Sequence, residues 1–129
     1  MNVTNNKVKT SGELLSAIRN GDIDRAEKLI KKRADVNAKD EFGRTALMYT
    51  VMNGYADVAK MLIEKGADVN AKDKLGWTAL MYAEMYGYTE LAKLLIEKGA
   101  DVNAKDKLGR TALMFAEAYE LIQSLQRRL

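Results

Sequence analysis

A 33-residue period runs through most of the chain and constrains its fold more than any other feature. Gly43, Gly76 and Gly109 are spaced by 33 residues. Laying residues 40–72 over residues 73–105 gives 23 identities in 33 positions without a gap. A repeat of this length predicts a stacked array of small helical units, because one unit cannot cover its own apolar face and needs its neighbours to do so.

Each repeat is predicted to contain two helices. Thr45, Thr78 and Thr111 each precede a short apolar segment and can cap the free backbone donors of a helix start. An Asn-Gly or Tyr-Gly pair then ends this first helix. The second helix is predicted from Asp57 to Lys65 and from Glu90 to Lys98, where the apolar residues fall at a helical spacing. A glycine ends it, and a turn-rich loop leads into the next repeat.

Two long motifs make the family resemblance specific. They read Asp40-x-x-Gly43-x-Thr45-Ala46-Leu47 and Leu62-Ile63-Glu64-Lys65-Gly66-Ala67-Asp68-Val69-Asn70-Ala71-Lys72, and both recur one period later. They closely resemble ankyrin repeats, and the resemblance covers about residues 12–129. It implies an all-α ankyrin-repeat solenoid, in which stacked helix-turn-helix units are joined by β-hairpin-like loops.

One departure from the family pattern lies inside the motif. All three copies read Thr-Ala-Leu-Met where the family commonly has Thr-Pro-Leu-His, a variant that resembles bacterial ankyrin proteins. Proline at the first helical position helps but is not required, so the fold prediction stands. Met48, Met81 and Met114 replace a hydrogen-bonding histidine and are expected to make adaptable apolar contacts between repeats.

The repeat boundaries predict one helical domain over residues 11–129, preceded by a flexible segment over residues 1–10. The domain is expected to comprise an N-terminal cap, two full repeats and a modified closing repeat, at residues 11–39, 40–72, 73–105 and 106–129. In the closing repeat, Tyr119-Glu120-Leu121 stands where Tyr86-Gly87-Tyr88 predicts a glycine. The last two helices are therefore expected either to fuse or to meet through a tighter turn.

Composition argues against most kinds of chemistry. The chain has no His and no Cys, which removes thiol catalysis, most nucleophile–base pairs and nearly all zinc sites. The recurrent aspartates open turns, and the loop from Asp35 to Asp40 lacks the twelve-residue calcium pattern with its closing Glu. We therefore expect no catalytic residues, no metal and no cofactor.

Charge and hydropathy bear on where the protein is located and on whether it binds nucleic acid or a membrane. The formal net charge is +3, and the 21 basic residues are spread along the chain rather than gathered in a block, which disfavours nucleic acid as a partner. No apolar stretch approaches the roughly 20 residues of a membrane helix, and the N-terminus does not resemble a secretory signal. These features predict a cytoplasmic protein that does not bind a membrane.

The resemblance implies protein binding through the hairpin tips and the inner face of each first helix. Trp, Tyr and Arg dominate interface energetics, and Arg44 and Asn53 of one repeat become Trp77 and Tyr86 in the next. Trp77 is expected to be the residue that the core needs least, because its equivalents are arginines. The candidate partner-binding residues are Trp77, Tyr86, Arg44, Arg110, Met52, Met85, Tyr119, Phe42, Leu75 and Leu108.

Some of these positions also have a structural interpretation. Phe42, Leu75 and Leu108 are expected either to bind a partner or to pack tip against tip along the stack. Core packing is the favoured interpretation of the aromatic residue at the fourth position of each first helix, Tyr49, Tyr82 and Phe115. Glu84 and Glu117 replace a small apolar residue of the family pattern. They are interpreted as partly exposed carboxylates, with a charged element of the recognition surface as the alternative.

The chain is therefore predicted to be a non-catalytic, monomeric module that binds another protein. An engineered or consensus-like ankyrin scaffold without a defined cellular partner is the alternative, suggested by the 23 identities between the two full repeats. The irregular caps and the Thr-Ala-Leu-Met motif speak against that alternative. An enzyme or a nucleic-acid binder is opposed by the lack of catalytic residues and of a clustered basic face.

Overall fold

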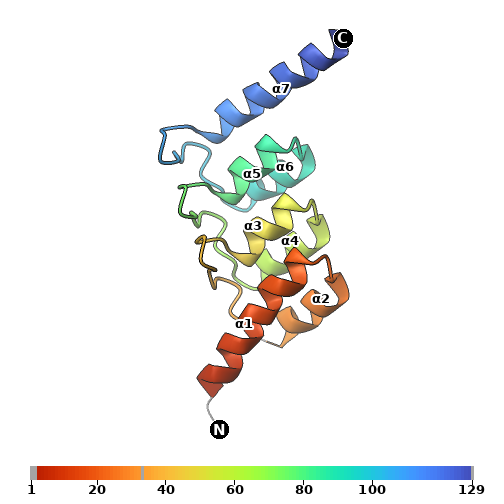
Figure 1. Cartoon of the computed structure of the whole chain (residues 1–129), viewed down its shortest axis with the longest axis vertical. Helices are drawn as coiled ribbons and strands as arrows, with labels where there is room; N and C mark the ends of the chain where they lie inside the picture. The colour runs from red at the N-terminus through yellow and green to blue at the C-terminus, as the bar shows by residue number, and fades with distance from the viewer. Residues whose placement is uncertain (1–2, 33, 129) are drawn as a thin grey trace. The chain divides into compact units, whose positions relative to one another are not determined.

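The computed structural model describes residues 3–32 and 34–128, and seven α-helices lie within them (Figure 1). The helices are α1 (Val3–Arg19), α2 (Ile23–Lys31), α3 (Ala46–Met52), α4 (Ala56–Glu64), α5 (Ala79–Met85), α6 (Thr89–Glu97) and α7 (Ala112–Arg128). No strand occurs in the described residues, so the all-α prediction is confirmed.

The helices form two compact units, which divide between Asp68 and Val69. In the first unit α1 packs against α2 and α3, and α4 packs against α2 and α3. In the second unit α5 packs against both α6 and α7. The single domain predicted over residues 11–129 therefore contains two units, each with its own buried core. Fully buried residues include Leu14, Ile18, Ile30, Leu47, Met48 and Leu62 in the first unit and Leu80, Met81 and Leu95 in the second.

The N-terminal segment differs from the prediction. Residues 1–10 were expected to be flexible and separate from the helical domain, but the structure begins α1 at Val3, so residues 3–10 are helical. Residues 1 and 2 lie outside the described part of the chain. The physical reason is that neither proline nor glycine occurs before Gly12, so nothing interrupts a helix propagating back from the buried Leu14.

The predicted threonine caps are present in the two full repeats. The Oγ1 of Thr45 accepts a hydrogen bond from the Met48 N–H at 3.3 Å, and Thr78 accepts one from the Met81 N–H at the same distance. At Thr111 the main-chain carbonyl accepts the Met114 N–H at 3.1 Å. Helices α4 and α6 begin and end one residue before the predicted bounds, within the usual uncertainty of helix ends.

An asparagine in the connecting loop ties one repeat to the turn that ends the next. The Asn37 amide donates to the Gly66 carbonyl at 3.0 Å, and its Oδ1 accepts the Asp68 N–H at 2.7 Å. One period later Asn70 makes the same two hydrogen bonds, to the Gly99 carbonyl and from the Asp101 N–H. A side chain with both a donor and an acceptor is required here, because the turn presents one group of each kind.

The closing repeat consists of one continuous helix. Of the two alternatives for the C-terminal end, fusion is confirmed, since α7 runs for 17 residues from Ala112 to Arg128. Its N-terminal part carries the repeat's first-helix sequence, yet Met114 is half exposed whereas Met48 and Met81 are fully buried. Met114, which lies on the final helix, is therefore covered much less than its two counterparts, and its apolar contacts between repeats stay a prediction.

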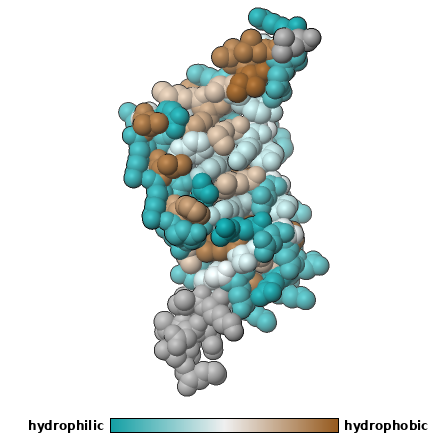
Figure 2. Space-filling model, in the orientation of Figure 1, coloured by the Kyte–Doolittle hydropathy of each residue, from teal (hydrophilic) through white to brown (hydrophobic). Residues whose placement is uncertain are grey.

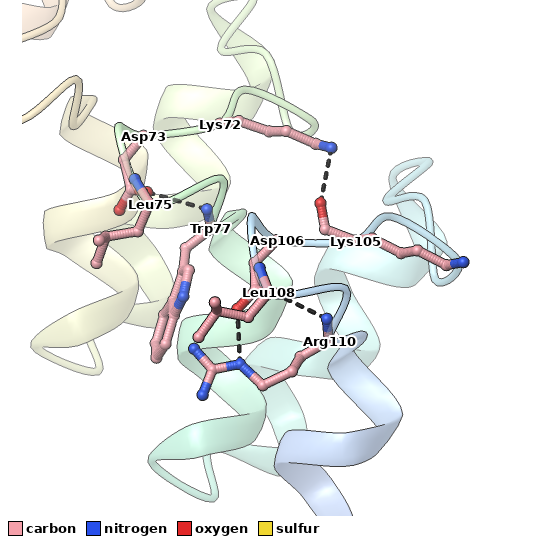
Figure 3. Close-up of polar contacts among 8 residues, drawn as sticks. All are labelled: Lys72, Asp73, Leu75, Trp77, Lys105, Asp106, Leu108 and Arg110. Atoms are coloured by element: carbon pink, nitrogen blue, oxygen red, sulfur yellow. Dashed lines mark hydrogen bonds and ion pairs between the residues drawn. The ribbon is translucent and has the colours of Figure 1, made fainter.

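The hairpin tips are held by an aspartate at the start of each tip. One carboxylate oxygen of Asp73 accepts the N–H groups of Leu75 and Trp77, both at 2.9 Å (Figure 3). Asp40 and Asp106 accept the equivalent pairs of N–H groups at 2.8 to 3.0 Å. These side chains satisfy backbone donors that the short turn leaves without a backbone partner, so the conformation of the tip is fixed.

The second carboxylate oxygen is satisfied differently in the closing repeat. The hydroxyls of Tyr49 and Tyr82 donate to Asp40 and Asp73, respectively. The third repeat has Phe115 at this position, which has no hydroxyl, and there the Arg110 Nε donates to Asp106 at 2.9 Å. The exchange of tyrosine for phenylalanine therefore coincides with an arginine donor in the hairpin.

We predict that Tyr82→Phe lowers the free energy of unfolding by about 1.5 kcal/mol, because it removes a hydrogen bond to a buried carboxylate. Tyr86→Phe removes a hydroxyl from an exposed side chain and serves as the control, with an expected change within about 0.5 kcal/mol. Urea denaturation followed by circular dichroism measures both variants. Equal stability of the two variants would contradict the role assigned to the Tyr82 hydroxyl.

Candidate functional site

The apolar residues at the hairpin tips are exposed. Phe42, Leu75 and Leu108 are 48%, 54% and 75% exposed, respectively. Leu75 and Leu108 lie on hairpins of the second unit that touch through their backbones, since the Lys107 N–H donates to the Leu75 carbonyl at 3.1 Å. Gly76 permits this approach, because an added Cβ would lie 2.9 Å from the Lys107 nitrogen.

Trp77 belongs to the core, contrary to the prediction that the core needs it least. Its side chain is only 9% exposed, and its ring centroid lies 4.9 Å from that of Tyr82 and 4.6 Å from that of Phe115. The reason is that this hairpin position points inward over the first helix. An arginine at the same position can lay its aliphatic stem there and keep its charged end in water. Partner contact by Trp77 stays a prediction.

An arginine covers the aromatic residues in each unit. The Arg110 guanidinium lies 5.8 Å from the Trp77 ring centroid and 5.2 Å from that of Phe115. In the first unit the Arg44 guanidinium lies 5.3 Å from the Phe42 ring. Distances under about 6 Å allow a cation–π attraction, which fixes the direction of the guanidinium. Each unit thus presents a half-buried arginine that is oriented by aromatic rings.

The predicted first-helix residues have different environments. Met52 and Met85 are half-buried, whereas Tyr86 is 41% exposed. The Tyr86 ring stacks on that of Tyr88 at 5.8 Å between centroids, and Tyr88 is also exposed. The sequence analysis did not select Tyr88, although a tyrosine one residue after the glycine of the turn recurs as Tyr55 and could have drawn attention to it.

Tyr119 packs within the second unit. Its ring lies over the turn between α5 and α6, where a Cβ added to Gly87 would overlap the ring atoms. Gly87 also has a φ of +73°, a conformation that other residues rarely adopt. Glycine is therefore required at this position for two reasons, its backbone conformation and its contact with Tyr119. The Tyr119 side chain is half-buried against it.

Glu84 lies in an apolar cleft between α5 and α7. The cleft has a volume of about 330 Å³, and its lining includes Leu80, Ile96, Leu113 and Ala116. Burial raises the pKa of the Glu84 carboxyl above its ordinary value. The interpretation of Glu84 as a partly exposed carboxylate agrees with its half-buried position, and its counterpart Glu117 is exposed.

The hairpin aspartates are perturbed in the opposite direction. Burial raises the pKa of Asp106, but hydrogen bonds from the N–H groups of Arg110 and Leu108 and from the Arg110 side chain outweigh it. The net pKa of Asp106 therefore lies below its ordinary value. The pKa of Asp40 is also below its ordinary value. Burial raises this pKa, but hydrogen bonds from donors that include the Tyr49 hydroxyl have a larger effect in the opposite direction.

The described residues offer little for other kinds of site. No cluster of three or more His, Cys, Asp or Glu side chains in residues 3–32 and 34–128 could hold a metal ion. None of the helices within these ranges combines the length and the apolar character needed to cross a membrane.

Comparison with models of protein families identifies the family of this chain. A family model described as ankyrin repeats in three copies matches residues 14–106 and 75–126. The chain belongs to the ankyrin repeat family. The resemblance and the fold class inferred from the sequence are thereby confirmed. Ankyrin repeats are generally non-enzymatic protein-interaction modules. A search of curated proteins finds no match to this chain.

The lowered pKa of Asp106 predicts a pH dependence of stability. A folded pKa below the unfolded value of about 3.9 contributes stability that is fully present above that value. This stability is lost as the pH falls through the folded pKa. We expect Asp106→Asn to lower stability at neutral pH and to make the loss of stability below about pH 5 shallower. Urea denaturation at a series of pH values tests this, and an unchanged slope would contradict it.

Proposed function

We propose that this ankyrin-repeat chain is a non-catalytic module that binds a protein partner through its hairpin tips and the C-terminal ends of its first helices. The observation that carries the proposal is the exposure of Phe42, Leu75 and Leu108 on hairpins whose backbones are fixed by buried or half-buried aspartates. A partner that covered these tips would remove their large apolar side chains from water.

The fixed conformation of the tips favours binding. Association normally loses free energy through the ordering of loops and side chains at the interface. Here the N–H groups of Leu75 and Leu108 are already bonded to Asp73 and Asp106 at 2.9 Å. The tips therefore need little further ordering when a partner covers their apolar side chains.

Aromatic and cationic residues add to the proposed binding residues within each unit. Tyr86 and Tyr88 form an exposed stacked pair at the end of the first helix of the second unit. Tyrosine supplies a large contact area at a low entropic cost and is enriched at interfaces. Arg44 and Arg110 add charged groups whose directions are set by neighbouring rings.

The burial of Trp77 changes its proposed role. With 9% of its surface exposed, Trp77 offers a partner little area, but its ring lies beneath the Arg110 guanidinium. We assign it to supporting Arg110 and the hairpin rather than to carrying the contact. Replacing Trp77 would therefore perturb the core together with the surface, and exposed tip residues make better test positions.

The test compares two double variants of the second unit as baits in affinity purification with quantitative mass spectrometry. Leu75→Ser with Leu108→Ser removes the apolar tips, whereas Ile96→Ser with Val102→Ser removes two similarly exposed apolar side chains elsewhere. We expect the tip variant to lose captured proteins that the wild type and the control retain. An interface residue of this kind is worth about 1–2 kcal/mol, so two such losses weaken binding at least tenfold.

Circular dichroism and thermal unfolding verify that both variants fold. If the folded tip variant captures the same proteins in the same amounts as the wild type, the hairpin tips are not the binding surface. Loss of capture with the control alone would move the proposed surface to the cleft that Ile96 and Val102 line.

A further inference from the structure

The hairpins of the second unit, residues 72–77 and 105–110, carry an excess of positive charge. They contain five basic and two acidic residues, so their net charge of +3 equals that of the whole chain. The rest of the chain therefore has no net charge. The basic residues are Lys72, Lys74, Lys105 and Lys107, which are exposed, and Arg110, which is half-buried.

The two acidic residues of these hairpins do not offset the charge at the surface. Asp73 and Asp106 are each only 6% exposed, and each accepts two N–H groups of its own tip. No ion pair joins the ammonium of Lys74 or Lys107 to another residue in the described part of the chain. Asp101, the next acidic residue before the third hairpin, accepts the N–H of a loop residue at 2.9 Å. The two lysines therefore present uncompensated charge.

Each of these lysines lies next to an exposed apolar side chain. Leu75 follows Lys74, and Leu108 follows Lys107. Figure 2 shows apolar patches within a hydrophilic surface along the edge where the hairpins before α5 and α7 lie. The tips of the second unit thus combine positive charge with large apolar groups.

Two hydrogen bonds join the two hairpins into one surface. The Lys107 N–H donates to the Leu75 carbonyl at 3.1 Å, and the Lys72 ammonium donates to the Lys105 carbonyl at 3.0 Å (Figure 3). In this view Leu75 and Leu108 extend to one side of their hairpins, and Lys72 and Lys105 extend to the other. The two leucines therefore lie on one fixed surface that basic residues border.

The tip of the first unit has a different charge. Glu41 stands where the hairpins of the second unit have Lys74 and Lys107, and its side chain is exposed. It lies between the basic residues Lys39 and Arg44 in the sequence, so the charges of this tip are mixed. A uniformly positive tip is therefore a property of the second unit.

We infer that the hairpin tips of the second unit bind a protein segment in which acidic residues adjoin large apolar ones. The inference rests on the proposed function and specifies the chemistry of the partner. Carboxylates of the segment pair with Lys74 and Lys107, and its apolar side chains cover Leu75 and Leu108. Complementary charge of this kind speeds association and disfavours basic partners.

Arg110 adds a directed donor to this surface. Its guanidinium gives the Nε donor to Asp106 at 2.9 Å, and 42% of its side chain is exposed. A guanidinium has five N–H donors, so others are left for a carboxylate of the partner. The rings of Trp77 and Phe115 hold the group in place.

Two other anionic partners fit this surface less well. Single-stranded nucleic acids stack their bases on exposed aromatic side chains, but the aromatic residue of these hairpins, Trp77, is buried. An anionic membrane would gain little from Leu75 and Leu108, which expose fewer apolar carbons than a single acyl chain. Such a chain by itself gives only marginal membrane binding.

Selection from a library of random peptides displayed on phage, with the full chain as bait, tests the inference. We expect the selected peptides to be enriched in Asp and Glu beside large apolar residues. Lys74→Glu with Lys107→Glu should weaken the binding of a synthesised selected peptide at least about tenfold, because attraction becomes repulsion. Lys93→Glu with Lys98→Glu makes the same change at exposed lysines of the same unit, away from the tips, and should leave this binding unchanged.

Circular dichroism verifies that both variants fold. A folded tip variant that binds the peptide as tightly as the wild type would overturn the inference. So would a selection that yields no peptide or peptides without an excess of acidic residues, including the case in which vesicles with phosphatidylserine or DNA bind instead.

The same selection separates this inference from the proposed function. Peptides without acidic residues that are lost with Leu75→Ser and Leu108→Ser would show that the tips bind a partner and that only the charge preference is wrong. Peptides that bind equally to the leucine variant and to the lysine variant would count against both.

Discussion

The hydrogen bonds that each hairpin aspartate accepts from the backbone N–H groups of its own tip are the interaction on which the rest of this structure depends. Asp73 accepts two N–H groups with one oxygen and the Tyr82 hydroxyl with the other. It therefore joins the hairpin to the first helix of the same repeat. Asp106 also accepts two N–H groups of its tip, but its second oxygen accepts the Arg110 side chain, which belongs to the same hairpin. In all three hairpins the aspartate therefore fixes the conformation of the tip that carries the exposed apolar residue.

Much of the fold could be predicted because the same local sequence features occur in more than one repeat. The threonine caps, the turn glycines and the helical spacing of the apolar residues are each visible in at least two copies. The burial of Tyr49, Tyr82 and Phe115 also follows the predicted core assignment. Periodic positions are constrained by the same neighbours in every repeat, so their environments can be inferred from one another.

The errors fall where the copies differ. Trp77 was interpreted through its arginine equivalents, but a side chain at this position can either fill the space above the first helix or reach past it. In the closing repeat Arg110 and Phe115 stand where the preceding repeat has Trp77 and Tyr82. The sequence does not show that the arginine then supplies the hydrogen bond that the tyrosine makes to the hairpin aspartate. Likewise, the absence of a glycine after Tyr119 left fusion and a tighter turn equally open. Only the course of α7 decides between them and reveals its exposed face.

The chemistry of the hairpin tips suits recognition of another protein. The tips are short and fixed, and an arginine lies over the aromatic rings beside them. The face of α7 is different: Leu113 and Met114 are exposed there, whereas the equivalent Leu80 and Met81 of the preceding repeat are buried.

The most direct test of the central claim is amide hydrogen exchange at the hairpin tips, followed residue by residue by NMR. If the aspartates fix the tips, the N–H groups of Leu75, Trp77, Leu108 and Arg110 exchange slowly, as members of stable hydrogen bonds do. Asp73→Asn should then accelerate exchange at Leu75 and Trp77 while leaving Leu108 and Arg110 protected. Exchange of all four at the rate of an open turn in the wild type would contradict the account.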